Sequence, residues 1–98
     1  MNATYPATLR SEPEGGYTVL FPDLEGCITY GEDLKHALAM AHEALGLYLV
    51  SLEEYGHVPP HPSDIASVST NTKDQVNLIK VNVNNYRRSA TAMMSEAV

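Results

Sequence analysis

The chain has 98 residues, with six Lys or Arg against 12 Asp or Glu, one Cys and no Trp. A domain of this size buries only somewhat more than about 60% of its unfolded surface, so we expect leftover apolar area to form an oligomer interface. One Cys excludes an internal disulfide, and no apolar run reaches the roughly 18 residues of a membrane span. With no signal peptide recognised, the prediction is a single soluble domain in a reducing cytoplasm.

The negative charge lies in the first two thirds of the chain. Residues 1–64 hold ten acids against Arg10 and Lys35, a balance of −8, whereas residues 65–98 hold two acids and four bases, a balance of +2. An acidic surface favours a basic partner, because affinity for nucleic acid comes mainly from cations that neutralise the phosphates. We therefore do not expect residues 1–64 to bind nucleic acid directly.

Three short strands are predicted first. The stretch "TYPATLRSE" (residues 4–12) alternates apolar and polar side chains, which is typical of a half-buried strand. Pro6 cannot donate to a strand ladder, so this strand is expected to start there or to lie at a sheet edge. "PEGG" (13–16) favours a hairpin into "YTVLF" (17–21), and "PDLEG" turns the chain into "CITYG" (27–31). The result is a three-stranded meander.

A long helix is predicted next. Apolar side chains recur at helical spacing at Leu34, Leu38, Ala41, Leu45, Tyr48, Leu52 and Tyr55. Asp33 is a candidate N-cap, and negative charge at Glu32 and Asp33 is favoured near a first turn. Gly56 is placed to end the helix, and the prolines at 59 and 60 forbid its continuation. This helix is long enough to cover one face of a sheet.

A polar connection at 61–74 is expected to cross back over the sheet into a fourth strand at 75–86. Ile79, Val81 and Val83 share one face of that strand and Leu78 lies on the other. Because one helix covers only one face, we predict that Leu78, Ile79, Val81 and Val83 contribute to an oligomer interface, in a homodimer or higher even oligomer. The predicted class is α+β, ordered β-β-β-α-β, with an antiparallel or mixed sheet.

Four acids flank the turns: Asp23, Glu25, Glu32 and Asp33. Paired carboxylates bind a metal or do acid-base chemistry only where they converge in a cleft with at least one desolvated. Turn and cap positions select Asp and Glu for local reasons, which favours a solvated acidic rim over a catalytic site.

The histidines and the cysteine do not assemble a site either. His36 and His42 lie about 240° apart round a helix axis, and His57 and His61 lack a third zinc ligand. Cys27 has no neighbouring cation to lower its thiol pKa, so core packing is favoured over a nucleophile. We predict no metal, no cofactor and no catalysis.

The runs "YPATL", "GGYTVLFPDLEGCITYGEDLKHALAMAHEAL", "YLVSLEEYGHVPPHPS" and "IKVNV" together resemble the HicB-like antitoxin family of type II toxin-antitoxin systems. The resemblance covers about residues 4–86. It implies a shortened RNase H-like domain over residues 1–86 that has lost the metal-binding carboxylates. It also implies that the protein binds a HicA-type toxin, a small basic mRNA-cleaving protein, and masks its active site.

On this interpretation the rim of Asp23, Glu25, Glu32 and Asp33 contacts the toxin. Many family members continue into a DNA-binding segment, for which residues 87–98 are too short, so operator binding is not expected. Two alternatives stay open. One is a metal-dependent hydrolase or nuclease using Asp23, Glu25 and a histidine; the other is a dimeric regulator without a toxin.

Overall fold

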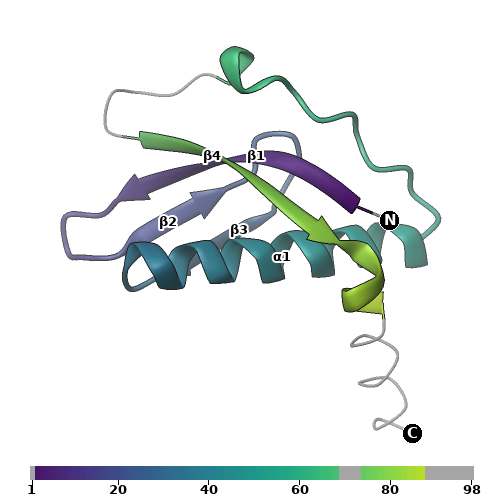
Figure 1. Cartoon of the computed structure of the whole chain (residues 1–98), viewed down its shortest axis with the longest axis horizontal. Helices are drawn as coiled ribbons and strands as arrows, with labels where there is room; N and C mark the ends of the chain where they lie inside the picture. The colour runs from purple at the N-terminus through teal and green to yellow at the C-terminus, as the bar shows by residue number, and fades with distance from the viewer. Residues whose placement is uncertain (1, 69–73, 88–98) are drawn as a thin grey trace, which may run out of the picture.

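The computed structural model describes residues 2–68 and 74–87. They form β1 (Asn2–Ser11), β2 (Tyr17–Leu20), β3 (Ile28–Gly31), α1 (Leu34–Glu54), a short 3-10 turn η1 (Ile65–Ser67) and β4 (Asp74–Asn82). The strands make one sheet in the order β3-β2-β1-β4 with every neighbouring pair antiparallel. α1 packs along one face of this sheet (Figure 1). The predicted α+β class, with one long helix on one face, is confirmed.

β1 is central in the strand order and begins at Asn2, so the expectation that a strand starts at Pro6 is wrong. The alternative expectation, that Pro6 lies at a sheet edge, holds locally. β4 pairs with β1 from Asn2 to Arg10, whereas β2 pairs only with Thr8 to Ser11. The half of β1 that holds Pro6 therefore has a strand neighbour on one side only. A proline fits there because its missing N–H can lie on the side without a ladder.

α1 begins and ends where the sequence predicts. The Asp33 carboxylate accepts a hydrogen bond from the backbone N–H of His36 at 2.7 Å, which makes Asp33 the N-cap. At the other end Gly56 has a φ of 72°, and the N–H of His57 donates to the Leu52 carbonyl at 2.9 Å. This left-handed turn satisfies carbonyls of the last helical turn and stops the helix.

The buried stripe of α1 differs from the predicted one at its ends. Ala41 and Leu45 are fully buried as expected, but Leu34 is 38% exposed and Tyr55 is 76% exposed. The predicted positions repeat every seven residues, and a straight helix drifts about 20° per heptad from such a repeat. The outer members of the stripe therefore rotate out of the core, and Ala37 and Leu49 take their places.

The sheet and the helix approach very closely at Gly31. A Cβ added to Gly31 would lie 2.2 Å from the backbone nitrogen of Ala37. The core fills the rest of the layer with inward-facing side chains: Tyr5, Ala7, Leu9, Val19, Phe21, Leu24, Cys27, Ile79, Val81 and Val83. Burial of this apolar surface, at about 25 cal/mol per Å², is the main stabilising term of the domain.

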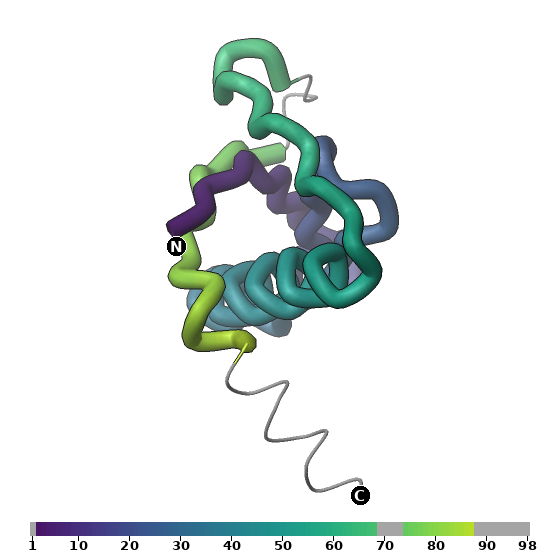
Figure 2. The backbone as a smooth tube through the Cα atoms, turned by 90° about the vertical axis from the view of Figure 1, so that its right-hand side faces the viewer, coloured from purple at the N-terminus to yellow at the C-terminus, as the bar shows by residue number. Residues whose placement is uncertain are grey.

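The segment after α1 first passes beside the end of the helix and the open edge of β1, and then continues on the side of the sheet away from the helix (Figure 2). This return makes β4 antiparallel to β1, with Arg10 opposite Asp74 and Asn2 opposite Asn82. Residues 61–68 form the connection as predicted, Asp74 already belongs to β4, and residues 69–73 lie outside the described part.

The fourth strand is shorter than predicted. β4 ends at Asn82, whose side-chain oxygen accepts from the backbone N–H of Asn84 at 3.0 Å, and residues 83–87 form a helical turn. Tyr86 lies against Gly46 of α1, and the Arg87 guanidinium pairs with the Glu53 carboxylate. The predicted strand to residue 86 is wrong from Val83 onward, because the chain turns back onto α1.

Candidate functional site

The turn between β2 and β3, residues 21–27, is a compact, self-bonded loop. Backbone hydrogen bonds join Phe21 to Cys27 at 3.1 Å, and Leu24 to both Phe21 and Cys27 at 3.0 Å. The side chains of these three residues are buried, so the loop is anchored on the core. Asp23 and Glu25 alternate with the anchors and are held at fixed positions at this end of the sheet.

Asp23 does not form a free rim. Its two carboxylate oxygens accept hydrogen bonds from Ser63, one from the backbone N–H at 2.9 Å and one from the hydroxyl at 2.6 Å. Burial and the charge of Asp23 together raise the pKa of the Tyr5 phenol, whose hydroxyl donates to the Pro60 carbonyl at 2.5 Å. Asp23 and Tyr5 thus fasten the segment after α1 to the sheet.

Glu25 is different, because only its backbone is engaged. The Glu25 carbonyl accepts from the Tyr48 hydroxyl at 2.8 Å, which ties the loop to α1. The Glu25 residue is exposed, and its carboxylate makes no hydrogen bond or ion pair within residues 2–68 and 74–87. This carboxylate is available to a basic partner.

Glu32 and Asp33 lie at the start of α1. Asp33 is occupied as the helix cap, while the backbone N–H of Glu32 donates to the His36 ring nitrogen Nδ1 at 3.0 Å. The arrangement resembles a capping box, except that the His36 ring accepts from Glu32, one residue before the cap, rather than from Asp33 itself. The side chain of Glu32 stays exposed.

The four predicted acids therefore do not gather into one rim. Asp23 and Glu25 precede β3, and Glu32 and Asp33 follow it, so the two pairs are separated by a four-residue strand of about 13 Å. The β1–β2 hairpin joins the second pair instead, because the Tyr30 hydroxyl donates to the Gly15 carbonyl at 3.0 Å. This places the hairpin, which includes Glu12 and Glu14, next to the start of α1. The sequence did not predict this neighbourhood, because it depends on the register between β2 and β3.

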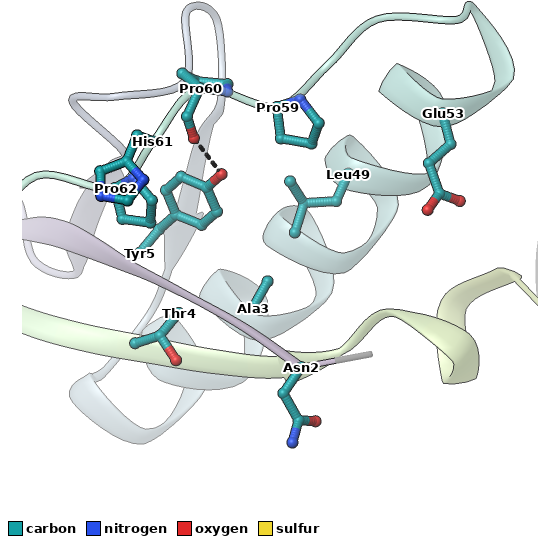
Figure 3. A pocket seen from close by; sticks show the side chains of 10 residues that line it. All are labelled: Asn2, Ala3, Thr4, Tyr5, Leu49, Glu53, Pro59, Pro60, His61 and Pro62. Atoms are coloured by element: carbon teal, nitrogen blue, oxygen red, sulfur yellow. Dashed lines mark hydrogen bonds between the residues drawn. The ribbon is translucent and has the colours of Figure 1, made fainter.

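A pocket of about 400 Å³ opens beside the first half of β1. Residues 2–5 form one wall, Leu49 and Glu53 of α1 form the floor, and residues 59–62 close the other side (Figure 3). The lining is mostly apolar, and Glu53 already pairs with Arg87. The pocket suits apolar contact with a protein side chain rather than acid-base chemistry. The sequence signals it only through the proline-rich run "VPPHP".

The thiol and the imidazoles are placed for structure. Burial raises the pKa of the Cys27 thiol to about 11, which leaves it protonated at neutral pH. The His42 ring lies 2.7 Å from the Leu38 carbonyl, within the same helix. In the described ranges no group of three or more His, Cys, Asp or Glu could hold a metal ion. Nor is any helix there long and apolar enough to cross a membrane.

The predicted oligomer interface is corrected by the packing of β4. Ile79, Val81 and Val83 face α1 and are buried within the single chain, so their side chains are not available to another protomer. Leu78 points to the opposite face and is 55% exposed. The residues alternate in this way because successive side chains of a strand point to opposite faces.

Comparisons with known proteins agree on one family. The profile described as "HicB_like antitoxin of bacterial toxin-antitoxin system" matches residues 5–94. Antitoxin HicB 1 of Photorhabdus laumondii is 48% identical over 44 residues, which is 45% of this chain and 28% of that protein. Antitoxin HicB of Escherichia coli K12 is 38% identical over 63 residues, 64% of this chain and 46% of that protein. The chain thus spans less than half the length of these curated relatives.

Solved structures show the same fold. A chain of the "Toxin-Antitoxin complex from Streptococcus pneumoniae" has a TM-score of 0.78 and 33% identity, covering 88% of this chain and 73% of that one. A chain of the "HicA3 and HicB3 toxin-antitoxin complex" has a TM-score of 0.63 and 22% identity, covering 78% of this chain and 94% of that one. The second likeness shows the fold alone.

Proposed function

The chain belongs to the HicB-like antitoxin family of bacterial toxin-antitoxin systems, and from this premise we propose that it binds and neutralises a HicA-type toxin. The observation that carries the proposal is the family match over residues 5–94, together with 33% identity to a chain of a toxin-antitoxin complex. The balance of −8 over residues 1–64 suits a small basic partner.

The mechanism that we propose is masking. A bound antitoxin covers the RNA-cleaving site of the toxin and keeps the substrate out. The exposed carboxylates of Glu25 and Glu32 would steer the encounter, since complementary charge raises the association rate while exposed pairs contribute only about 0–1 kcal/mol each. Asp23 and Asp33, the other two predicted contacts, would act by holding the loop and the helix start in place.

Finer points belong to the same proposal. We propose that the protein has no catalytic activity and acts in the cytoplasm. The family, the acidic charge and the absence of a carboxylate cleft among the described residues support these points. The shortened RNase H-like description, with the order β-β-β-α-β over residues 1–86, is likewise proposed.

The test first asks whether a neighbouring reading frame encodes a small basic protein, and then uses that protein as the partner. Purified chain should inhibit RNA cleavage by that protein in a stoichiometric complex. Glu25→Gln should slow association and weaken its salt dependence with little change in dissociation, and Glu54→Gln at the end of α1 is the matched control. Failure to bind any such neighbour would favour the dimeric regulator. Metal-dependent cleavage by the chain itself, lost in Asp23→Asn, would show that it is an enzyme.

A further inference from the structure

β4 is a long edge strand. It has nine residues and occupies one end of the sheet order, whereas the opposite edge, β3, has only four. Among the described residues no strand pairs with the outer side of β4. An exposed edge of this length presents backbone N–H and C=O groups that can pair with another strand, unless proline, a bulge or charge prevents it.

The sequence features that usually prevent such edge pairing, namely proline, bulges and many charged side chains, are nearly absent from β4. The strand, "DQVNLIKVN", contains no proline and no glycine, and its charges are Asp74 and Lys80. Because Ile79 and Val81 point into the core, the alternate residues Asp74, Val76, Leu78 and Lys80 share the outer face. Lys80 and Leu78 are exposed on that face.

The outer-face residues are complementary to themselves when the strand is reversed. In an antiparallel pair centred on Asn77, Asp74 of one copy lies opposite Lys80 of the second copy, and Val76 lies opposite Leu78. Each contact occurs twice, as two-fold symmetry requires. Opposite charges and apolar pairs placed directly across a ladder are the pairs that stabilise a sheet.

Other registers lose this match. A shift of two residues in one direction puts Leu78 opposite Leu78 and Lys80 opposite Val76, and the other direction puts Asp74 opposite Leu78. A shift of one residue would bring outer-face positions against core-facing ones. Only the register centred on Asn77 pairs acid with base and apolar with apolar.

We propose that β4 is a dimerisation edge, through which two copies of the chain join their sheets into one eight-stranded antiparallel sheet with Asn77 on the two-fold axis. Both α1 helices then lie on the same face of the joined sheet. Arg10 extends the charge pattern across the strands, because its Nε lies 3.3 Å from the Asp74 carboxylate, on the same outer face. The order across three neighbouring strands becomes Arg10, Asp74 and then Lys80 of the second copy.

Single cysteine variants test the register directly. In Asn77→Cys the two new thiols face each other across the axis with a Cα separation of about 5 Å, which is within disulfide range. In Leu78→Cys they are about 8 Å apart, which is out of range. Mild oxidation should therefore cross-link Asn77→Cys much faster than Leu78→Cys. Ile28→Cys on the opposite edge is the matched control, and the buried Cys27 stays unreacted.

The charge pairs are tested by Lys80→Glu, which turns both attractive pairs into repulsive ones. Lys80 is exposed, so the variant should fold normally, as circular dichroism would verify. Sedimentation equilibrium should show a dimer of the unaltered chain and a dissociation constant raised by about tenfold in Lys80→Glu. A monomer at high micromolar concentration, or faster cross-linking of Leu78→Cys or Ile28→Cys than of Asn77→Cys, would overturn the proposal. No toxin is present in these assays, so they stand apart from the test of the antitoxin function.

Discussion

The two faces of the sheet carry apolar side chains for different purposes. On the inner face Leu9, Val19 and Ile79 are at most 1% exposed, because α1 covers them. On the outer face Leu20, Ile28 and Leu78 are 40 to 59% exposed. Alternation along a strand assigns each residue to a face, but only the helix decides which face is the core. Whether an apolar residue of this sheet belongs to the core or is exposed to a partner therefore depends on which of the two alternating faces its side chain occupies.

The difference between the two faces should be largest when an isoleucine on each face is replaced by alanine. Ile79→Ala on the inner face should lower the free energy of unfolding by about 2–5 kcal/mol, because it loses buried methyl groups and leaves a cavity. Ile28→Ala on the outer face should cost less than about 1 kcal/mol, since Ile28 is 59% exposed. Urea unfolding of both variants measures the difference. Equal losses would mean that the outer face is also covered.

Close packing of the inner face is tested at its glycines. Gly31→Ala should cost about 1–3 kcal/mol, because the new Cβ meets the backbone of Ala37, which cannot move without shifting α1. Gly46→Ala should cost less: its obstacle is the Tyr86 ring, and alanine favours the helix by about 1 kcal/mol. Thermal unfolding of the two variants ranks them. A larger loss of stability in Gly46→Ala than in Gly31→Ala would mean that α1 packs more tightly against Tyr86 than against β3.

The burial of Cys27 on the inner face makes the free energy of unfolding depend on pH. Its pKa is raised from 9.0 to about 11 in the folded protein, so between these values the unfolded chain has already lost a proton that the folded chain keeps. Stability from this group is therefore complete below pH 9 and is lost as the pH rises toward 11. Urea titrations from pH 8 to about 10.5 should show a decline that is smaller in Cys27→Ala. An equal decline in both proteins would assign it to other groups.

The smallest expected effect lies on the outer face. Arg10→Met removes the exposed partner of Asp74 and should lower the stability only slightly, because exposed ion pairs contribute little. High salt should reduce the difference in unfolding free energy between the unaltered protein and Arg10→Met, because exposed ion pairs are screened. Unfolding at low and high salt gives the result. A large, salt-independent loss would contradict this. It would mean that the burial of the Asp74 side chain, which is 7% exposed, matters more than the exposure of Arg10.

Much of the fold was predictable because its signals are local. The caps at Asp33 and Gly56, the period-2 strands and the hairpin turns each depend on residues within a few positions of one another. The same holds for Cys27, whose surroundings in the sequence offered no activating cation. The family itself was recognisable from contiguous runs of residues.

The candidate site was less predictable because it depends on contacts distant in sequence. Asp23 was expected in a solvated rim, but it bonds to Ser63, forty residues away. Glu25 and Glu32 were expected together, but β3 separates them. The pocket beside Tyr5 and Leu49 needs three elements that no local pattern relates.

The sequence by itself determined the alternation of each strand, the ends of α1 and the excess of acid, since each is set by neighbouring residues or by composition. The tertiary structure alone decided that β1 is central in the strand order with only its first half left as a local edge, that Ile79 and Val81 are covered while Leu78 is not, and that β4 is left as an edge. The physical reason is that strand order and helix placement follow from the total burial of apolar surface, which no single segment controls.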